Sequence, residues 1–389
     1  MNRAIKYSAL FFCLLQFAFA QLSDLDTRCL WIVRESMYNE KMINSALVYA
    51  YQSGYNIVFI QVRGRGYAFY NSDIVPKHPK IAPEFDPLDY AVTLGHALGI
   101  EVHAWMNSYI LWSSNTPPEN PEHLYHTQKG WTEANIHGKM DSQIKLSQSQ
   151  SPQWEGVYLS PTHPEVNPYL LSVYSEIINS YNIDGIHLDY IRFQDEVYGY
   201  NKSGMAVFEN IYDLNPRDIV RGIISPRFGW SQEFVDSMYV AWDKFRRDAV
   251  TELVRNIYHE VHKPGHNIKL SAAVKPNIID AKYRWYQEWD KWVQKGIIDF
   301  VVPMNYFKEI RDFNNSVQIM KSNLVQDELE MVIIGISTYN QDAQSAADKI
   351  LLTRLNGFRG VSIFSWDSHK NNLEWFQPIN EALGQPAFD

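Results

Sequence analysis

Residues 183–193 read Ile-Asp-Gly-Ile-His-Leu-Asp-Tyr-Ile-Arg-Phe, and this stretch decides the fold. It is a short apolar run that carries His187 and Asp189 two residues apart. Because side chains alternate across a strand, these two share one face, while Leu188 and Tyr190 share the other. Buried parallel strands are almost wholly apolar. Two ionisable groups on one face therefore indicate either a satisfied core pair or a functional site.

Seven further apolar runs of strand length lie along the chain, and helical patterns separate them. The predicted strands cover residues 29–33, 56–62, 100–106, 183–193, 269–274, 298–304, 331–336 and 361–366. Strands that alternate with helices are parallel, and eight of them predict an α/β fold, the closed (β/α)8 TIM barrel. A doubly wound open sheet is the alternative, but no Gly-x-Gly-x-x-Gly follows the first strand. We expect residues 21–389 to form a single barrel domain.

Two long segments interrupt the regular alternation of strands and helices. Residues 109–160 follow the third strand and residues 194–230 follow the fourth, and both have little periodicity. Loops of this size inside a compact domain are more often functional than idle. After strands three and four they would stand at the C-terminal rim, where the active sites of such barrels are built.

The first twenty residues resemble a secretory signal peptide. Arg3 and Lys6 supply a positive start, an apolar stretch follows, and residues 18–20 form a small-x-small cleavage site. The apolar stretch is too short to span a bilayer as a helix. We therefore expect a secreted or periplasmic protein without a membrane anchor.

The net charge and the aromatic content indicate which kinds of ligand the protein binds. The net charge is −9 and no basic clusters occur, which argues against a nucleic-acid partner. The chain contains 12 Trp, 24 Tyr and 19 Phe. Trp and Tyr offer flat apolar faces with a polar edge, which suits sugar rings, although large cores also use aromatic residues. We identify no motif for a cofactor and predict none.

The C-terminal ends of the predicted strands are rich in carboxylates, cations, amides and aromatic rings. Such a set suits sugar hydroxyls, with an acid–base pair at the scissile bond. Asp189 is the predicted catalytic carboxylate. The second catalytic carboxylate is predicted to be Glu35 or Asp367. These residues follow strands one and eight, which are neighbours in a closed barrel. For each of them the alternative is a purely structural role.

The predicted substrate-binding residues share these strand ends, and they are Arg63, Arg65, Trp105, Asn107, His187, Arg192, Asn305, Tyr306 and Trp366. Arg63 and Arg65 lie beside glycines, which let the backbone approach a ligand closely. His187 and Arg192 are expected to set the ionisation and orientation of Asp189. A neighbouring Arg lowers the pKa of a carboxyl group, whereas burial raises it.

Three segments resemble the glycosyl-hydrolase-like family 10 domain. They are Val-His-Ala-Trp-Met-Asn (102–107), Tyr-Leu-Ser-Pro-Thr-His-Pro-Glu-Val (158–166) and the stretch at 183–193. That family consists of exported bacterial barrels described as glycosidases, some of them linked to peptidoglycan glycan strands. The resemblance covers nearly all of the chain after the signal peptide. It implies a sugar-cleaving barrel with an oligo- or polysaccharide substrate.

A fainter likeness is to the chitinase-type family 18 glycosidases. Their fourth strand reads Asp-x-x-Asp-x-Asp-x-Glu, and the last Glu is the proton donor. Asp184 and Asp189 match this pattern, but His187 replaces one Asp and Ile191 occupies the donor position. Because Ile191 cannot donate a proton, the chitinase mechanism does not carry over, and the likeness supports fold and ligand class only.

Two other functions stay open beside an exported glycoside hydrolase that cleaves O-glycosidic bonds. A metal-dependent hydrolase would need His103, His187 and Asp189 to converge, yet the first strand has no His-x-His pair and no His-Glu-x-x-His occurs. We therefore predict no metal. A non-catalytic glycan-binding barrel is the other alternative, which Ile191 at the donor position favours.

Overall fold

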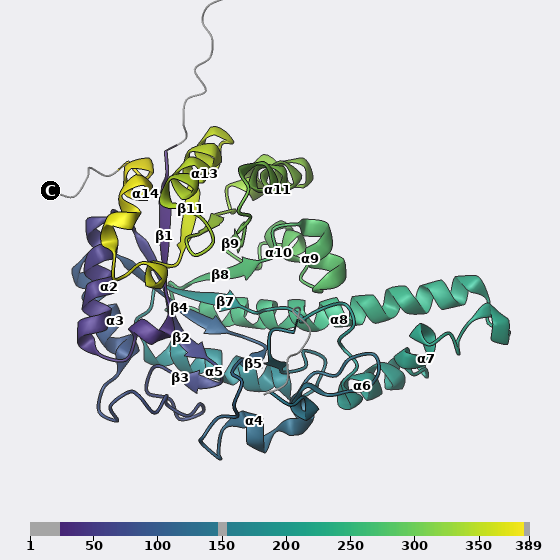
Figure 1. Cartoon of the computed structure of the whole chain (residues 1–389). Helices are drawn as coiled ribbons and strands as arrows, with labels where there is room; N and C mark the ends of the chain where they lie inside the picture. Colours follow the sequence, from purple (N-terminus) through teal and green to yellow (C-terminus); the bar gives the residue numbers. More distant parts are fainter. Residues whose placement is uncertain (1–23, 147–153, 385–389) are drawn as a thin grey trace, which may run out of the picture.

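The computed structural model describes residues 24–146 and 154–384. The predicted signal peptide lies outside these residues. The barrel strands are β1 (Thr27–Ile32), β2 (Ile57–Gly64), β4 (Glu101–Asn107), β7 (Gly185–Asp189), β8 (Lys269–Val274), β9 (Phe300–Pro303), β10 (Ile334–Ser337) and β11 (Gly360–Phe364) (Figure 1). All eight pair in parallel, in the order β10-β11-β1-β2-β4-β7-β8-β9.

The ring closes between the two ends of this order. Val301 of β9 forms a parallel bridge to Val332, and Met304 forms another to Gly335 of β10. Further along the ring, β11 pairs with β10 and with β1, the first strand of the chain. This arrangement confirms the predicted (β/α)8 barrel and contradicts a doubly wound open sheet, whose first and last edges would stay unpaired.

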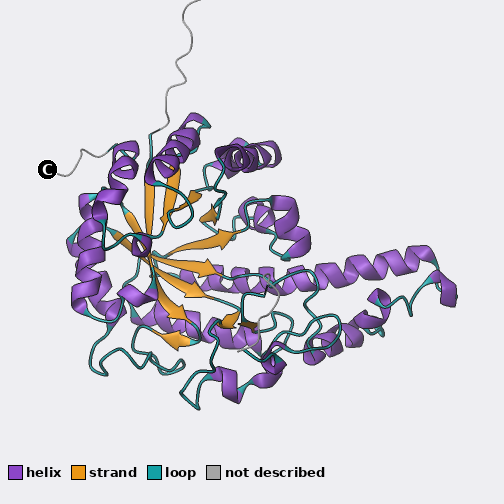
Figure 2. Ribbon diagram, in the orientation of Figure 1, coloured by secondary structure: helices purple, strands orange, loops and turns teal. Residues whose placement is uncertain are grey.

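Helices surround the strands and form the outer layer (Figure 2). They are α2 (Glu40–Gln52), α3 (Pro87–Ala97), α5 (Val166–Ser180), α8 (Gln232–Val261), α9 (Ile278–Arg284), α10 (Trp289–Gln294), α11 (Ile310–Asn323), α12 (Gln326–Leu329), α13 (Ala343–Leu355) and α14 (Gln377–Ala382). Polar side chains begin several of them. The Asp86 carboxylate, for example, accepts hydrogen bonds from the Leu88 and Asp89 N–H groups, and Pro87 occupies the first position of α3.

Side chains along each strand point alternately into and out of the barrel, so the strands contribute to two separate cores. Ile186 and Leu188 face outward and pack beneath the helices. The inward-facing residues fill the centre of the barrel, and that cluster comprises Cys29, Trp31, Ile57, Phe59, Trp105, Ala273, Phe300, Val302 and Ile333. His187 lies among them, with its ring stacked 4.0 Å from that of Phe59. The barrel is therefore a packed core with its hollow at one end.

Two segments add structure beyond the repeating pattern. Residues 108–165, between β4 and α5, contain α4 (Leu124–Thr127) and the antiparallel pair β5 (Ile110–Trp112) and β6 (Val157–Tyr158). Residues 190–231, between β7 and α8, contain α6 (Lys202–Tyr212) and α7 (Pro216–Val220). A short strand, β3 (Tyr67–Ala68), pairs with the end of β2. Of the helices in the described ranges, none is long and apolar enough to cross a membrane.

Candidate active site

A cavity of about 460 Å³ opens at the C-terminal ends of the barrel strands. It is lined by Trp31, Val33, Arg34, Gln61, Trp105, Asn107, Ile110, Ser113, Glu155, Asp189, Tyr190, Arg192, Lys275, Met304, Tyr306, Tyr339 and Phe364. The wall combines aromatic rings with polar groups, and two carboxyl groups, those of Glu155 and Asp189, belong to it. This is the end of a (β/α)8 barrel at which active sites are built.

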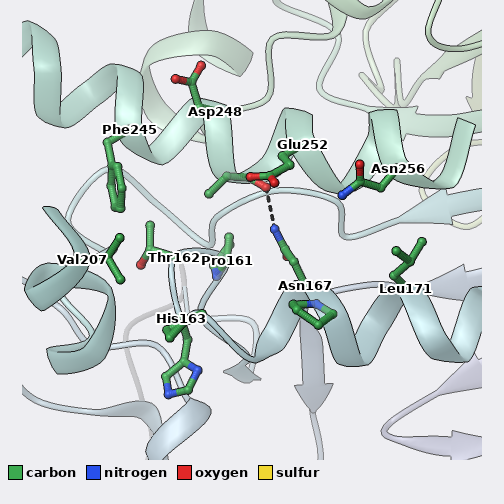
Figure 3. A pocket seen from close by; sticks show the side chains of 13 residues that line it. Pro161, Thr162, His163, Asn167, Leu171, Val207, Phe245, Asp248, Glu252 and Asn256 are labelled. Carbon is green, nitrogen blue, oxygen red and sulfur yellow. Dashed lines mark hydrogen bonds between the residues drawn. The ribbon is translucent and has the colours of Figure 1, made fainter. Parts of the chain in front are cut away.

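A second hollow of about 470 Å³ lies outside the barrel, where α5, α6 and α8 meet (Figure 3). Its acidic side chains, Asp248 and Glu252, come from α8, and His163 comes from the loop before α5. Asp248 is ion-paired with Lys244. Because no residue of a barrel strand lines this hollow, we place the candidate active site in the barrel cavity.

Asp189 is the last residue of β7 and reaches the cavity because it continues the inward face that begins with His187. Its Oδ2 accepts a hydrogen bond of 3.1 Å from Trp105 Nε1, and its Oδ1 accepts one of 2.7 Å from the Tyr190 N–H. Burial raises the pKa of Asp189 to about 6, against the opposing effect of these hydrogen bonds and of Arg192. A carboxyl group that keeps its proton at mildly acidic pH suits a general acid.

Glu155 supplies the second carboxyl group and comes from the insertion, two residues before β6. The Arg192 Nη2 donates to both carboxylate oxygens, at 3.1 and 2.8 Å. The Tyr158 hydroxyl also donates to this carboxylate. Burial would raise the pKa of Glu155, but Arg192, Lys275 and Tyr158 outweigh it and hold that pKa below its usual value. Glu155 is therefore ionised under conditions in which Asp189 is protonated.

The backbone around Glu155 is fixed by two buried polar side chains. Gln194 Oε1 accepts a hydrogen bond of 2.7 Å from the Glu155 N–H. Asp141 Oδ2 accepts one of 3.0 Å from the Tyr158 N–H, and Asp141 Oδ1 accepts one of 3.3 Å from Trp154 Nε1. These contacts on both sides of Glu155 position its carboxylate, which an aperiodic loop alone would not do.

Lys275, which directly follows β8, is another cation of the cavity wall. Its ammonium group lies 4.5 Å from the centre of the Trp285 ring. Burial and the neighbouring Arg192 lower the pKa of Lys275 to about 8, so it is still charged at neutral pH. Together with Arg192 it offsets the negative charge of Glu155 within the cavity wall.

Comparison with known proteins identifies the family of this chain. The profile of the glycosyl hydrolase-like 10 family matches residues 26–350. The chain belongs to this family. Its resemblance to that family, predicted from the three segments above, is therefore confirmed, and membership supports a glycoside hydrolase role.

The chain is also similar to individual proteins of known name. The chain is 25% identical over 311 residues to glycosyl hydrolase DigH of Escherichia coli (strain K12), in an alignment that covers 74% of this chain and 63% of DigH. The chain thus spans less than two thirds of the length of that relative. The PgaB (BpsB) glycoside hydrolase domain from Bordetella bronchiseptica superimposes with a TM-score of 0.65 at 13% identity, covering 92% of this chain and 98% of that domain. The last likeness shows the fold alone.

The fold is also similar to that of a chitinase domain. A domain attributed to a chitinase from Desulfitobacterium hafniense superimposes with a TM-score of 0.52 at 11% identity, covering 92% of this chain and all of that domain (100%). This agrees with the distant relation to family 18 glycosidases that the fourth strand predicts. At this identity it concerns the fold and carries no residue roles.

Five of the residues predicted from the sequence line the cavity of this family member, and they are Trp105, Asn107, Asp189, Arg192 and Tyr306. Asn107 Oδ1 accepts a hydrogen bond of 3.1 Å from Gln61 Nε2, so its orientation is fixed. The Tyr306 ring stacks on Phe364 with 5.4 Å between centroids. The structure brings these five together because they lie in or follow three different strands, β4, β7 and β9, at one rim.

Three predicted substrate-binding residues are buried away from the cavity wall. His187 lies within the barrel core, where its Nδ1 is 2.7 Å from Ser271 Oγ. Arg63 Nη1 donates to the carbonyl oxygens of Asn107 and Ser108. Asn305 Nδ2 donates to the Phe313 carbonyl at 3.1 Å. The Arg63 and Asn305 side chains therefore hold backbone in place, and His187 is packed in the core. None of the three lines the cavity.

Arg65 and Trp366 are also not among the residues that line the cavity, although Arg65 contacts one of them. Arg65 Nε donates to Ser113 Oγ at 3.1 Å, which ties it to the rim loop. Trp366 is buried outside the barrel interior, among the residues that pack beneath the helices. Both follow a strand end, where alternation no longer determines the direction of a side chain.

The two carboxylates predicted to partner Asp189 have different surroundings from those expected. The Glu35 side chain is 45% exposed and pairs with Arg34 at 2.9 Å. Asp367 Oδ2 accepts a hydrogen bond of 2.7 Å from the Val33 N–H, and its Oδ1 accepts from Ser36 Oγ and from Lys370 Nζ. In the described part of the chain, the carboxylate that shares the cavity with Asp189 is Glu155, which sequence reasoning missed.

Replacing Asp367 by Ala is expected to lower the free energy of unfolding by about 2–3 kcal/mol, because it leaves the Val33 N–H and the buried Ser36 hydroxyl without their acceptor. Urea denaturation followed by circular dichroism measures this. Glu35→Ala is the matched control and is expected to change stability by less than about 0.5 kcal/mol. An Asp367 variant with unchanged stability and no turnover would instead assign Asp367 to catalysis.

Tyr190 departs from the predicted alternation. Its φ of 51° ends β7 at Asp189 and turns the chain, so the Tyr190 side chain lines the cavity instead of the outer face. The left-handed conformation is costly for a bulky residue and tends to occur at functional sites. Here the turn also brings the Arg192 guanidinium over the Tyr190 ring, 5.1 Å from its centre.

The histidines of the metal hypothesis do not form a ligand set. His103 Nε2 lies 3.3 Å from Glu101 at the opposite end of β4 from the cavity, and His187 contacts Ser271. Across residues 24–146 and 154–384, no three His, Cys, Asp or Glu side chains gather as metal ligands would.

Proposed function

We propose that this protein is an exported glycoside hydrolase that cleaves O-glycosidic bonds of a polysaccharide or a peptidoglycan-type glycan. The observation that carries the proposal is one cavity with two carboxyl groups whose pKa values move in opposite directions, up for Asp189 and down for Glu155. Groups whose environments separate their pKa values divide into an acid and a base. The signal-like start of the sequence supports export, and the family supports the reaction class.

In the proposed reaction, the protonated Asp189 donates its proton to the oxygen of the leaving sugar as the glycosidic bond breaks. The ionised Glu155 either attacks the anomeric carbon or takes a proton from the water that does so. Arg192 keeps Glu155 charged and oriented before the sugar binds. The rings of Trp105, Tyr190 and Tyr306 offer apolar faces on which sugar rings stack.

The pH dependence of kcat/KM follows from these roles. Activity requires protonated Asp189, so it falls as pH rises through about 6, and it requires ionised Glu155, so it falls again in strong acid. We expect an optimum below about pH 6 and roughly 100-fold lower kcat/KM at pH 8. New reducing ends released from a panel of polysaccharides and from peptidoglycan measure it.

An optimum at alkaline pH would contradict these assignments. Glycans that bind without any release of reducing ends across the panel would favour the non-catalytic glycan-binding barrel. Unchanged turnover after removal of both carboxyl groups would reject the cavity as the active site.

A further inference from the structure

An arm projects from the barrel next to β7 and β8. It consists of α6, α7 and the first half of α8, which reach well beyond the other helices (Figure 1). The arm has its own apolar core, which comprises Tyr200, Met205, Phe208, Leu214, Ile219, Ile224, Val235 and Trp242. From Val250 onward, in contrast, the buried residues of α8 belong to the barrel core. The 30-residue helix is about 45 Å long, so its first half extends past the barrel.

The arm stands at the same end of the barrel as the cavity. α8 returns the chain from the C-terminal end of β7 to the N-terminal end of β8. Its second half packs along the barrel, and its first half therefore continues beyond the rim on which Asp189 lies. A surface that the tip of the arm contacts would therefore lie on the same side of the protein as the mouth of the cavity.

The tip of the arm, residues 221–230, exposes large apolar side chains. Ile223 is 51% exposed, Phe228 62% and Trp230 42%. Single exposed apolar residues are ordinary, but three within eight residues at the end of a projection need an explanation. Gly229, with a φ of 91°, turns the chain between Phe228 and Trp230, and nothing lies within 4 Å of where its Cβ would be. The backbone at Gly229 therefore faces open space at the end of the projecting arm (Figure 1).

The charge of the tip is opposite to that of the protein as a whole. Arg221 and Arg227 are exposed, and the Arg227 guanidinium lies 5.7 Å from the centre of the Phe228 ring. From residue 219 to residue 232 the sequence contains no Asp or Glu, although the chain carries a net charge of −9. The tip therefore combines apolar side chains with local positive charge.

We propose that residues 221–230 dock this protein onto the surface of an anionic lipid bilayer. Trp and Phe side chains enter the boundary between headgroups and acyl chains, and arginines pair with lipid phosphates. A stable protein interface buries about 800 Å² on each partner. Three exposed side chains at the end of a projection cannot supply that area, whereas the fluid surface of a lipid bilayer adapts to them.

The test is sedimentation of the full chain with vesicles. Vesicles of phosphatidylglycerol and phosphatidylcholine in equal parts are expected to pellet the protein, and vesicles of phosphatidylcholine alone to pellet much less. The double variant Phe228→Ser, Trp230→Ser is expected to bind the anionic vesicles at least about tenfold more weakly. Arg227→Gln should weaken binding at low salt and reduce its dependence on salt.

Val240→Ser is the matched control, because Val240 is 64% exposed on α8 but lies outside the tip. It is expected to bind as the wild type does, and circular dichroism verifies that each variant folds. Equal binding of the double variant and the wild type would overturn the proposal. The absence of binding to anionic vesicles would also overturn it. If, in that case, light scattering finds a dimer that the double variant disrupts, the tip is an interface between two copies of the chain instead.

Discussion

Asp189→Asn is expected to lower the turnover of the wild-type substrate by about 1,000-fold while leaving the protein folded and able to bind the glycan. The amide has the shape of the carboxyl group but cannot give a proton to the leaving oxygen. Its oxygen can accept from Trp105 Nε1 or from the Tyr190 N–H, so the local structure loses at most one hydrogen bond. Initial rates of reducing-end release, with thermal unfolding in parallel, measure the two effects.

The shape of the pH profile separates a chemical role of Asp189 from a structural one. If Asp189 is the acid, the loss of activity near pH 6 should disappear from the residual activity of the variant. Asp213→Asn is the matched control, because Asp213 is an exposed residue with a φ of 51° at the end of α6, a conformation that Asn also accepts. Turnover of Asp189→Asn within a few-fold of the control would reject the assignment.

The eight strands were predictable because each is a short apolar run that alternates with a helical pattern, and alternation fixes the topology. Asp189 was predictable for the same reason: it shares the face of His187 and ends the strand. The same pattern could not separate their roles. His187 is one step deeper along the inward face, where Phe59 and Trp31 enclose it, and only Asp189 reaches the cavity.

Side-chain directions beyond the strand ends could not be read from alternation. Glu35 lies in a 3-10 turn (Arg34–Ser36), which leaves its carboxylate in solvent, and Asp367 lies in another (Trp366–Ser368), which aims it at the backbone of Val33. Glu155 was beyond reach for a different reason. It lies in an aperiodic segment, and only the pairing of β5 with β6 and the contacts of Asp141 and Gln194 bring it to the cavity.

Glu155→Gln is expected to lower turnover by about 1,000-fold, because the amide neither attacks an anomeric carbon nor takes a proton from water. Glu35→Gln is the matched comparison, since it is the same chemical change at a carboxylate that the sequence predicted and that lies outside the cavity wall. It is expected to keep turnover within about twofold of the wild type. Rates on the same glycan, with both proteins verified as folded, make the comparison.

The Glu155→Gln variant should also move the pH profile, which a purely structural loss would not do. The negative charge of Glu155 is one of the influences that raise the pKa of Asp189. Without that charge, and with Arg192 left unpaired beside the cavity, the pKa of Asp189 should fall, so the residual activity should be lost at a lower pH than in the wild type. Low turnover in Glu35→Gln with normal turnover in Glu155→Gln would assign the second carboxylate to Glu35. A profile that stays in place while turnover falls would make Glu155 a structural residue and would leave Asp189 without an ionised partner in its own cavity.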